Sequence, residues 1–254
     1  MMTSYTAVFF DAGGTLWYAR KTVVEVWHEV LAAQGMEISI ERINDAWQTM
    51  QPMRQGQVDA FETSGTPTSL AGVQEYLDQF NSKFLGELKI MDEDATLVGR
   101  VHRGFENNRF LYPETADVLK ELQGKGYRLA IVSNGYEQEQ TAANLGIASY
   151  FDTIIGSFYV GFRKPMPEIY HMALDRLGIG PEQAIMVGDH WGADVEGPER
   201  VGIKGVHLHQ SRLGVHLDRG YPTPGAEAIK DLWGIVRLVN EDGSGVARGT
   251  PNSG

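Results

Sequence analysis

Short runs of apolar residues, each bounded by polar or turn-forming residues, recur along the chain. Runs of this length without polar alternation are typical of strands that are buried on both faces of a sheet. The runs are TAVFF (6–10), RLAIVS (128–133), DTIIGS (152–157), AIMVGD (184–189) and KGVHLH (204–209). Segments with helical periodicity lie between them, at 113–126, 137–147 and 166–178. The alternation predicts an α/β protein with a parallel sheet, whose ligands bind at the carboxyl ends of the strands.

The stretch from about residue 18 to residue 107 departs from this alternation, because it shows helical periodicity and no convincing strand. Apolar residues fall on one face of predicted helices near 23–35, 40–50 and 70–84. We therefore predict a small helical domain that is inserted directly after the first strand. The polar segment 54–69, which follows the second of these helices, is predicted to be a mobile loop.

These patterns set the expected domain limits. The sheet core is expected to comprise residues 1–17 and 108–240, and the helical domain residues 18–107. Residues 241–254 carry little apolar content, so we expect them to form a disordered tail.

The composition narrows the classes of protein to consider. With 254 residues and 42% hydrophobic content, the chain can bury one sizeable core and a smaller second one. It contains no cysteine, which excludes disulfides and thiolate metal sites. The apolar run near the N-terminus is too short for a signal peptide or a membrane span, so we expect a cytoplasmic protein without a membrane partner.

The charge balance bears on possible partners. The formal net charge is -11, from 33 acidic and 22 basic residues, and the basic residues form no cluster. This argues against nucleic acid and other polyanionic partners. A small anionic substrate stays compatible with the charge, because a metal ion and a few local donors can reverse the sign of the field inside a cleft. No sequence feature indicates the oligomeric state.

Polar residues follow several of the predicted strands. Asp11 comes directly after the first strand, Ser133 and Asn134 after the second, and Asp189 after the fourth. In a parallel sheet these residues converge on one edge. Lys164 stands next to a proline just before a helix, where the proline limits local freedom and can hold the lysine over the same edge.

These residue types suit phosphoryl transfer. The carboxylate of Asp11 can attack phosphorus, and the hydroxyls of Thr15 and Ser133 can donate to phosphoryl oxygens. Lys164 can balance their charge, and Asp11 with Asp189 can supply carboxylates for Mg²⁺. The glycines that follow Asp11 allow a tight turn, which brings main-chain groups close to a metal and a phosphate.

Four motifs in this order resemble those of the haloacid dehalogenase superfamily of hydrolases, in its version with a helical cap after the first strand. They are FFDAGGTL, IVSNG, RKPMPEIY and MVGDHWGADVEG. The match extends to about residue 240, and the cap is similar in position and helical content only. The resemblance implies a Rossmann-like core, a cap that closes over the substrate, and Mg²⁺-dependent hydrolysis of a small phosphorylated metabolite through an aspartyl-phosphate.

The resemblance also implies roles for single residues. Asp11 and Lys164 are expected to be catalytic, and Mg²⁺ to be held by Asp11, Asp189 and the backbone carbonyl of Gly13. Asp194 is expected to orient metal-bound water or Lys164, with an early helix charge as the alternative. The residues expected to bind the substrate phosphate are Thr15, Gly14, Ser133, Asn134 and Lys164. For Ser133 and Asn134, capping of the following turn is the alternative role.

The first motif departs from most phosphatases of the superfamily, which carry a second aspartate where this chain has Gly13. That aspartate is the general acid and base, a contribution of typically ~10²–10⁴-fold in rate. A good leaving group, a residue from the cap, or a leaving group that needs no proton would each account for its absence. His190 is a candidate replacement acid, with a side chain that points away as the alternative.

Other functions stay open. Dehalogenases of the superfamily also lack the second aspartate, but the paired acids of GDHWGAD favour the metal-dependent branch. A phosphonate hydrolase would need a cap lysine, and Lys21, Lys83 and Lys89 lie in no motif. A catalytically weak binding protein is the alternative outside the enzymes.

Several aromatic and imidazole side chains have a structural interpretation. We expect Trp27 and Trp47 in the core of the helical domain, and Trp17 at the entrance of the cleft. The remaining histidines near the C-terminus lack the spacing of metal ligands, so we interpret them as structural. They are His207, His209 and His216.

Overall fold

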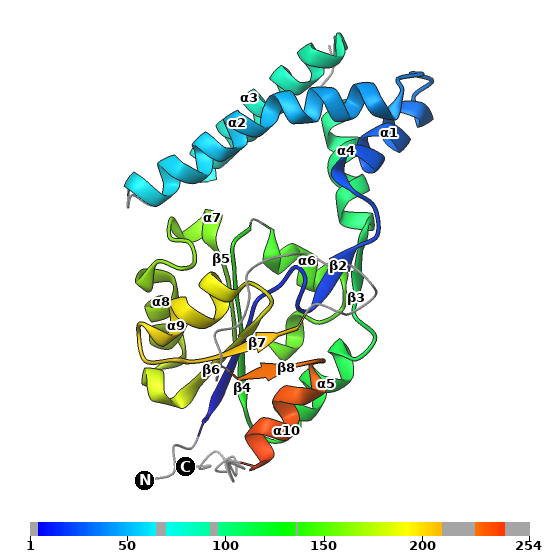
Figure 1. Cartoon of the computed structure of the whole chain (residues 1–254). Helices are drawn as coiled ribbons and strands as arrows, with labels where there is room; N and C mark the ends of the chain where they lie inside the picture. The colour runs from blue at the N-terminus through cyan, green and yellow to red at the C-terminus, as the bar shows by residue number, and fades with distance from the viewer. Residues whose placement is uncertain (1–4, 65–69, 92–95, 136, 210–226, 242–254) are drawn as a thin grey trace, which may run out of the picture. The chain divides into compact units, whose positions relative to one another are not determined.

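A computed structural model describes residues 5–64, 70–91, 96–135, 137–209 and 227–241 (Figure 1). In this part of the chain, six strands form one sheet in the order β5-β4-β1-β6-β7-β8, with every neighbouring pair parallel. The strands are β1 (Ala7–Phe10), β4 (Arg128–Ser133), β5 (Thr153–Gly156), β6 (Ala184–Gly188), β7 (Lys204–Leu208) and β8 (Ala228–Ile229). The predicted α/β fold with a parallel sheet is confirmed.

The register brings the predicted polar residues to one edge of the sheet. Phe10 of β1 lies opposite Ile131 of β4 and Val187 of β6, so Asp11 follows β1 at the level where its neighbours also end. Ser133 is the last residue of β4, and Asp189 follows β6 directly. The carboxyl ends of the three central strands therefore meet where the polar side chains were expected.

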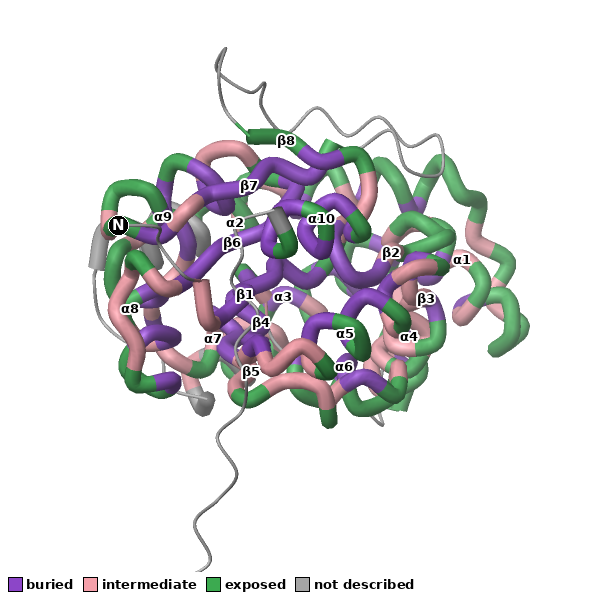
Figure 2. Tube along the Cα trace, turned by 90° about the horizontal axis from the view of Figure 1, so that it is seen from below, coloured by how far each residue is buried: buried purple, intermediate pink, exposed green. Residues whose placement is uncertain are grey.

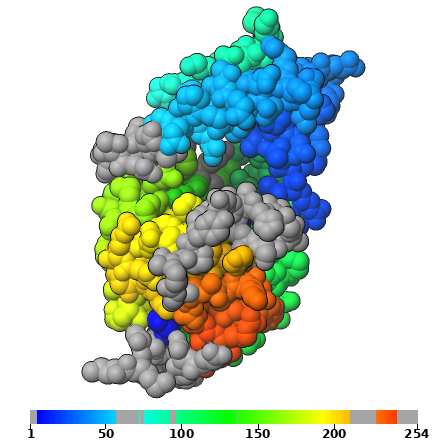
Figure 3. Space-filling model, viewed as in Figure 1, coloured from blue at the N-terminus to red at the C-terminus, as the bar shows by residue number. Residues whose placement is uncertain are grey.

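Helices cover both faces of the sheet, which is why its strands read as unbroken apolar runs. Val8 and Phe10 of β1 pack in one core cluster with α5 (Thr115–Gly124), α6 (Gln138–Asn144) and α10 (Trp233–Glu241). Ala7 and Phe9 face a second cluster with α8 (Pro167–Leu177). Figure 2 shows the central strands as largely buried, and every residue of β1 and β6 is buried. Exposed positions of α10, drawn in orange-red, contribute to the surface in Figure 3.

Short elements complete this part of the fold. They are the 3₁₀ turns η1 (Ala148–Tyr150) and η2 (Pro181–Gln183), the π-helical turn η3 (Trp191–Glu196), and the single turns α7 (Ser157–Val160) and α9 (Gly197–Glu199). The turn η3 begins two residues after Asp189 and carries Asp194. It therefore belongs to the same edge of the sheet as the loop that carries Asp11.

The chain divides into two compact units, Met1–Tyr18 with Leu111–Gly254, and Ala19–Phe110. The expected limits of the helical domain were residues 18–107. The division falls inside two short strands, β2 (Trp17–Ala19) and β3 (Arg109–Leu111), which pair in a sheet of their own. At the start of the helical unit, the side chain of Asn108 accepts from the backbone N–H groups of Arg20 and Lys21 and donates to the carbonyl of Lys21.

The helical unit contains α1 (Val23–Ala33), α2 (Ile40–Ser64), α3 (Leu70–Leu88) and α4 (Thr96–Asn107). A capping box starts α1, because the Thr22 side chain accepts from the N–H of Glu25 and the Glu25 side chain accepts from the N–H of Thr22. Trp27 is buried in the core of this unit, and Trp47 packs against that core with its ring 5.8 Å from that of Phe80. Both tryptophans therefore lie where the sequence placed them.

Three sequence-based expectations need correction or lie outside the described residues. The expected loop at 54–69 is wrong for its first part, because α2 continues to Ser64; residues 65–69 are not described. The polar character of this stretch was read as a loop, although most of its residues are compatible with a helix. The tail beyond residue 241 and His216 also lie outside the described residues. Among the described residues, no helix is long and apolar enough to cross a membrane.

Candidate active site

The loop after β1 is a tight turn in which several backbone N–H groups donate to one carbonyl group. The carbonyl of Ala12 accepts from the backbone N–H groups of Leu16 (2.8 Å), Thr15 (3.2 Å) and Trp17 (3.2 Å). Gly14 has a φ of +89°, and a Cβ there would lie 2.6 Å from Oδ2 of Asp189. The turn therefore needs glycine at position 14, since its backbone passes directly beside the second acid of the site.

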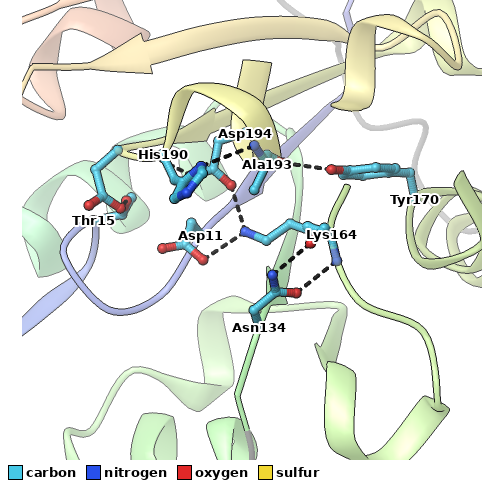
Figure 4. Close-up of polar contacts among 9 residues, drawn as sticks. Asp11, Thr15, Asn134, Lys164, Tyr170, His190, Ala193 and Asp194 are labelled. Atoms are coloured by element: carbon cyan, nitrogen blue, oxygen red, sulfur yellow. Dashed lines mark hydrogen bonds and ion pairs between the residues drawn. The ribbon is translucent and has the colours of Figure 1, made fainter. Parts of the chain in front are cut away.

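Lys164 joins two acids of the site (Figure 4). Its Nζ lies 2.7 Å from Oδ1 of Asp11 and 2.6 Å from Oδ1 of Asp194. All three residues are buried, with Lys164 only 2% exposed and Asp194 completely buried. A buried ammonium group between two carboxylates is held in one position, because each charge has a partner at hydrogen-bonding distance.

The charges in this cluster shift one another's proton affinity. Burial alone would lower the pKa of Lys164, but the charges of Asp11 and Asp194 outweigh it, so its pKa lies above the ordinary value of 10.5. Burial raises the pKa of Asp194, the Lys164 ammonium opposes this, and the negative charge of Asp11 adds to it. Lys164 is therefore a fixed positive charge at neutral pH.

The turn η3 presents Asp194 to Lys164. The second oxygen of Asp194, Oδ2, accepts from the backbone N–H of His190 at 2.8 Å. Tyr170 on α8 donates its hydroxyl to the carbonyl of Ala193 at 2.6 Å, which ties this turn to the helix that follows Lys164 (Figure 4). Both oxygens of Asp194 thus have partners within the protein, and its side chain is a structural support for the lysine.

The remaining acid, Asp189, lies beside Thr15. The Thr15 hydroxyl is 3.4 Å from Oδ1 of Asp189, and both side chains are buried. Carboxylate oxygens of Asp11, Asp189 and Asp194 all lie within 4.8 Å of one another. Such hard oxygen donors fit Mg²⁺. Because Asp194 is engaged by Lys164 and His190, Asp11 and Asp189 are the better placed of the three to hold a cation.

The two polar residues after β4 have different surroundings. Ser133 is buried, with 4% of its surface exposed, at the end of the strand next to β1. Asn134 is exposed, and its side-chain amide forms two hydrogen bonds with the main chain of Lys164. The Asn134 amide is thus engaged with the protein, which was not among the roles expected for it.

The structure brings most of the predicted site residues together. Asp11, Lys164 and Asp194 form one hydrogen-bonded set, and Thr15 and Asp189 form a pair beside it. Sequence reasoning missed Tyr170 and Ala193, whose contact supports the turn that carries Asp194. Tyr170 lies within the third motif, but its apolar neighbours gave it the pattern of an ordinary core residue.

Other expected roles have different outcomes. The expectation that Trp17 lines the cleft entrance is wrong, because Trp17 is 4% exposed and packs in the core cluster with α5. The ring nitrogen Nδ1 of His190 accepts from the N–H of Ala193 at 3.3 Å, so this histidine caps the turn η3. His207 is buried, and its ring packs against Trp191 at 5.7 Å.

The chain is similar to several known proteins. The family model described as haloacid dehalogenase-like hydrolase matches residues 5–202. A glyceraldehyde 3-phosphate phosphatase of Methanothermobacter thermautotrophicus is 38% identical over 97 residues, covering 37% of this chain and 43% of that protein. A phosphoserine phosphatase of Thermus thermophilus is 35% identical over 130 residues, covering 50% of this chain and 49% of that protein. These matches span about half the length of either relative or less.

A solved structure of similar fold covers nearly the whole chain. The defluorinating L-2-haloacid dehalogenase Rha0230 has a TM-score of 0.72 and 20% sequence identity, covering 94% of this chain and 97% of that one. At this identity the similarity establishes the fold alone.

Proposed function

Because the chain belongs to the haloacid dehalogenase-like hydrolase family, we propose that it is a Mg²⁺-dependent phosphatase of a small phosphorylated metabolite. The observation that carries this proposal is the charge of the buried cluster. Carboxylate oxygens of Asp11, Asp189 and Asp194 lie within 4.8 Å of one another, and the Lys164 ammonium group forms ion pairs with two of these acids, Asp11 and Asp194. A divalent cation held by Asp11 and Asp189 would balance this excess of negative charge and would supply positive charge for a phosphoryl group beside Asp11.

The relatives support the substrate class. The two relatives named above act, by name, on glyceraldehyde 3-phosphate and phosphoserine, both small phosphate monoesters. The matches leave about half of each relative uncovered, so they support a phosphorylated metabolite without indicating which one.

Asp11 is the proposed nucleophile. One of its carboxylate oxygens forms a bond to phosphorus while the bond from phosphorus to the leaving oxygen breaks, and water then cleaves the aspartyl-phosphate. Lys164 is the proposed second catalytic residue, since its contact with Oδ1 orients the Asp11 carboxylate for attack. When bound, Mg²⁺ supplies positive charge next to the transferring phosphoryl group; Asp11, Asp189 and the Gly13 carbonyl would hold it.

The substrate phosphate is proposed to lie against donors at the strand ends. Thr15 and Ser133 supply hydroxyls, and Lys164 supplies charge. The N–H of Gly14, which was also expected to bind the phosphate, donates to the Trp17 carbonyl at 2.7 Å. The helical unit, Ala19–Phe110, is the proposed cap that closes over this site and excludes bulk water.

Gly13 limits the range of substrates. A Cβ at position 13 would meet no atom within 4 Å, so the turn has room for a side chain that this chain does not supply. Without a general acid at that place, a leaving group of low pKa departs more readily than an alkoxide. We therefore expect acyl or aryl phosphates to be cleaved faster than sugar phosphates.

The same glycine favours a second candidate function. A halide leaves without a proton, so a haloacid dehalogenase that uses Asp11 would not need the missing acid. The paired acids Asp189 and Asp194 argue against a dehalogenase, because they would repel a carboxylate substrate in the absence of a metal.

The test is phosphate release from a panel of aryl, acyl and sugar phosphates, with Mg²⁺ and with EDTA. We expect Mg²⁺-dependent turnover that Asp11→Asn abolishes. Gly13→Asp, which has room for its side chain, is expected to raise the rate on sugar phosphates by about 10²-fold or more. Release of halide from haloacids in EDTA, with no phosphate release from any substrate, would instead establish the dehalogenase.

If neither product forms, the chain is a binding protein. In that case it should still bind Mg²⁺ and phosphate without turnover. The glycine at position 13, in place of the general acid and base, would then explain why catalysis is lost.

A further inference from the structure

The main chain of Lys164 is held from one side by a single amide. The backbone N–H of Lys164 donates to Oδ1 of Asn134 at 2.7 Å, and Nδ2 of Asn134 donates to the Lys164 carbonyl at 2.8 Å. The two residues are thirty positions apart, on different connections of the sheet. Figure 4 shows the amide facing the lysine backbone, opposite the end that meets the acids.

Lys164 needs such a support because it belongs to no helix or strand. It lies in the connection between α7 and α8, and the residue after it, Pro165, has no N–H to donate. The turn around it is closed by the N–H of Met166, which donates to the Arg163 carbonyl at 2.7 Å, but this bond leaves the N–H and the carbonyl of Lys164 itself to other partners. The amide of Asn134 pairs with both the N–H and the carbonyl of Lys164, as the backbone of a neighbouring strand would.

The position of the lysine backbone decides where its ammonium group can reach. Nζ must lie within hydrogen-bonding distance of both Asp11 and Asp194, at 2.7 Å and 2.6 Å. A lysine side chain has four flexible bonds, and a displaced backbone would let it satisfy one acid and lose the other. Asn134 holds the backbone of Lys164, and the two carboxylates hold its ammonium group. Together these contacts restrict the ammonium group to the place where it bridges Asp11 and Asp194.

We infer that Asn134 is a positioning residue, which acts through Lys164 and not through the substrate. This departs from the phosphate-binding role that the second motif suggests, because the amide oxygen and one N–H are already used within the protein. The kinetic consequence rests on the proposed phosphatase function, whereas the structural consequence for Lys164 does not.

The test compares the wild type with Asn134→Ala and Asn134→Asp. The carboxylate of the aspartate variant keeps an acceptor for the Lys164 N–H and loses the donor to its carbonyl. Asn144→Ala is the matched control, because Asn144 is also an exposed asparagine with a side-chain hydrogen bond, from Gln140 at 2.8 Å, on the surface of α6. Asn134 is exposed, so its removal leaves the core intact.

The first measurement is the rate of acetylation of Lys164 by acetic anhydride, followed peptide by peptide with mass spectrometry. We expect the buried Lys164 to be protected in the wild type and in Asn144→Ala, and to react about tenfold faster in Asn134→Ala, the equivalent of ~1.4 kcal/mol. Asn134→Asp is expected to lie between them. Equal protection in all four proteins would overturn the inference, whether or not the wild type hydrolyses any phosphate ester.

The second measurement is steady-state hydrolysis of an aryl phosphate with Mg²⁺. We expect kcat of Asn134→Ala to fall about tenfold together with the loss of Lys164 protection. A rise in KM with Lys164 still protected would show that Asn134 contacts the substrate, and would also overturn the inference. If Asn134→Ala fails to unfold cooperatively, the acetylation of Asn134→Asp decides in the same way.

Discussion

Lys164 is the residue whose removal should affect stability most within the site. Its ammonium group is the partner of two buried carboxylates, and Asp194 is completely buried. Lys164→Met keeps the size of the side chain and removes the charge, which leaves these carboxylates close together without compensation. Breaking a buried pair in this way costs about 3–5 kcal/mol. We expect urea unfolding at pH 7 to show a loss of this size.

A second substitution distinguishes lost charge from lost packing. Asp194→Asn in the Lys164→Met background removes the uncompensated carboxylate, so the double variant should be more stable than Lys164→Met alone. A double variant that is less stable than Lys164→Met would show that the charge of Asp194 is not the cause.

The same lysine predicts how stability depends on pH. The pKa of Lys164 in the folded protein lies above 10.5, since Asp11 and Asp194 outweigh the effect of burial. Above pH 10.5 the unfolded chain therefore releases this proton before the folded protein does, and the stability that Lys164 contributes decreases as pH rises. Below that pH the contribution is fully present.

We expect the difference in free energy of unfolding between the wild type and Lys164→Met to be constant from pH 8 to about pH 9.5 and to shrink above pH 10.5. Taking the difference between the two proteins cancels the titration of the other lysines. A difference that stays constant up to pH 12 contradicts a raised pKa.

At the level of elements, the hydroxyl of Tyr170 joins α8 to the turn η3. Burial raises the pKa of this hydroxyl, so it remains a donor to the Ala193 carbonyl at any ordinary pH. Tyr170→Phe leaves that carbonyl without this donor, and we expect a loss of about 1–3 kcal/mol in the free energy of unfolding. Because η3 carries Asp194, we also expect a lower kcat on an aryl phosphate.

The control for this prediction is Tyr127→Phe. Tyr127 is equally buried, and its hydroxyl donates to the carbonyl of Val239 on α10 at 3.4 Å. That substitution should affect stability with kcat unchanged. Equal kcat in the two variants and the wild type would show that the link from Tyr170 to η3 has no part in catalysis.

The elements differ in how well the sequence predicts them. The central strands were predicted because burial on both faces produces unbroken apolar runs, as in β4 and β6. The strand β8 has only two residues and offers no pattern to detect. The helix α2 was predicted too short, because its polar second half was taken for a loop, and α4 was not recognised as a separate helix.

The site likewise contains features that the sequence predicts and features that it does not. Asp11 and Asp189 were predicted because residues that follow parallel strands must meet at one edge. The pairing of Asn134 with the backbone of Lys164 was not, because a hydrogen bond between two loops leaves no periodic signal in either segment. Sequence patterns thus indicate which side chains gather, and the contacts among them decide what each one does.

At the scale of the whole molecule, the net charge of -11 complicates any test for a specific cation. A divalent ion would stabilise such a protein by screening alone, whether or not it binds at the site. Specific binding differs in that it depends on particular ligands. Asp189 is the best residue with which to separate screening from specific binding. It is one of 33 acidic residues, so its removal changes the overall charge little, but it lies next to Asp11 and Thr15 in the site.

We therefore expect Mg²⁺ to raise the free energy of unfolding of the wild type by about 2.7 kcal/mol at a hundred times its dissociation constant. In Asp189→Asn the increase should fall to that produced by NaCl of equal ionic strength. Glu121→Gln, which removes an acidic side chain paired with Lys125 on the surface of the sheet unit, is the control and should respond as the wild type does. An equal response in all three proteins would mean that Mg²⁺ acts on the overall charge, and the carboxylate cluster would then need another cation or a proton to balance it.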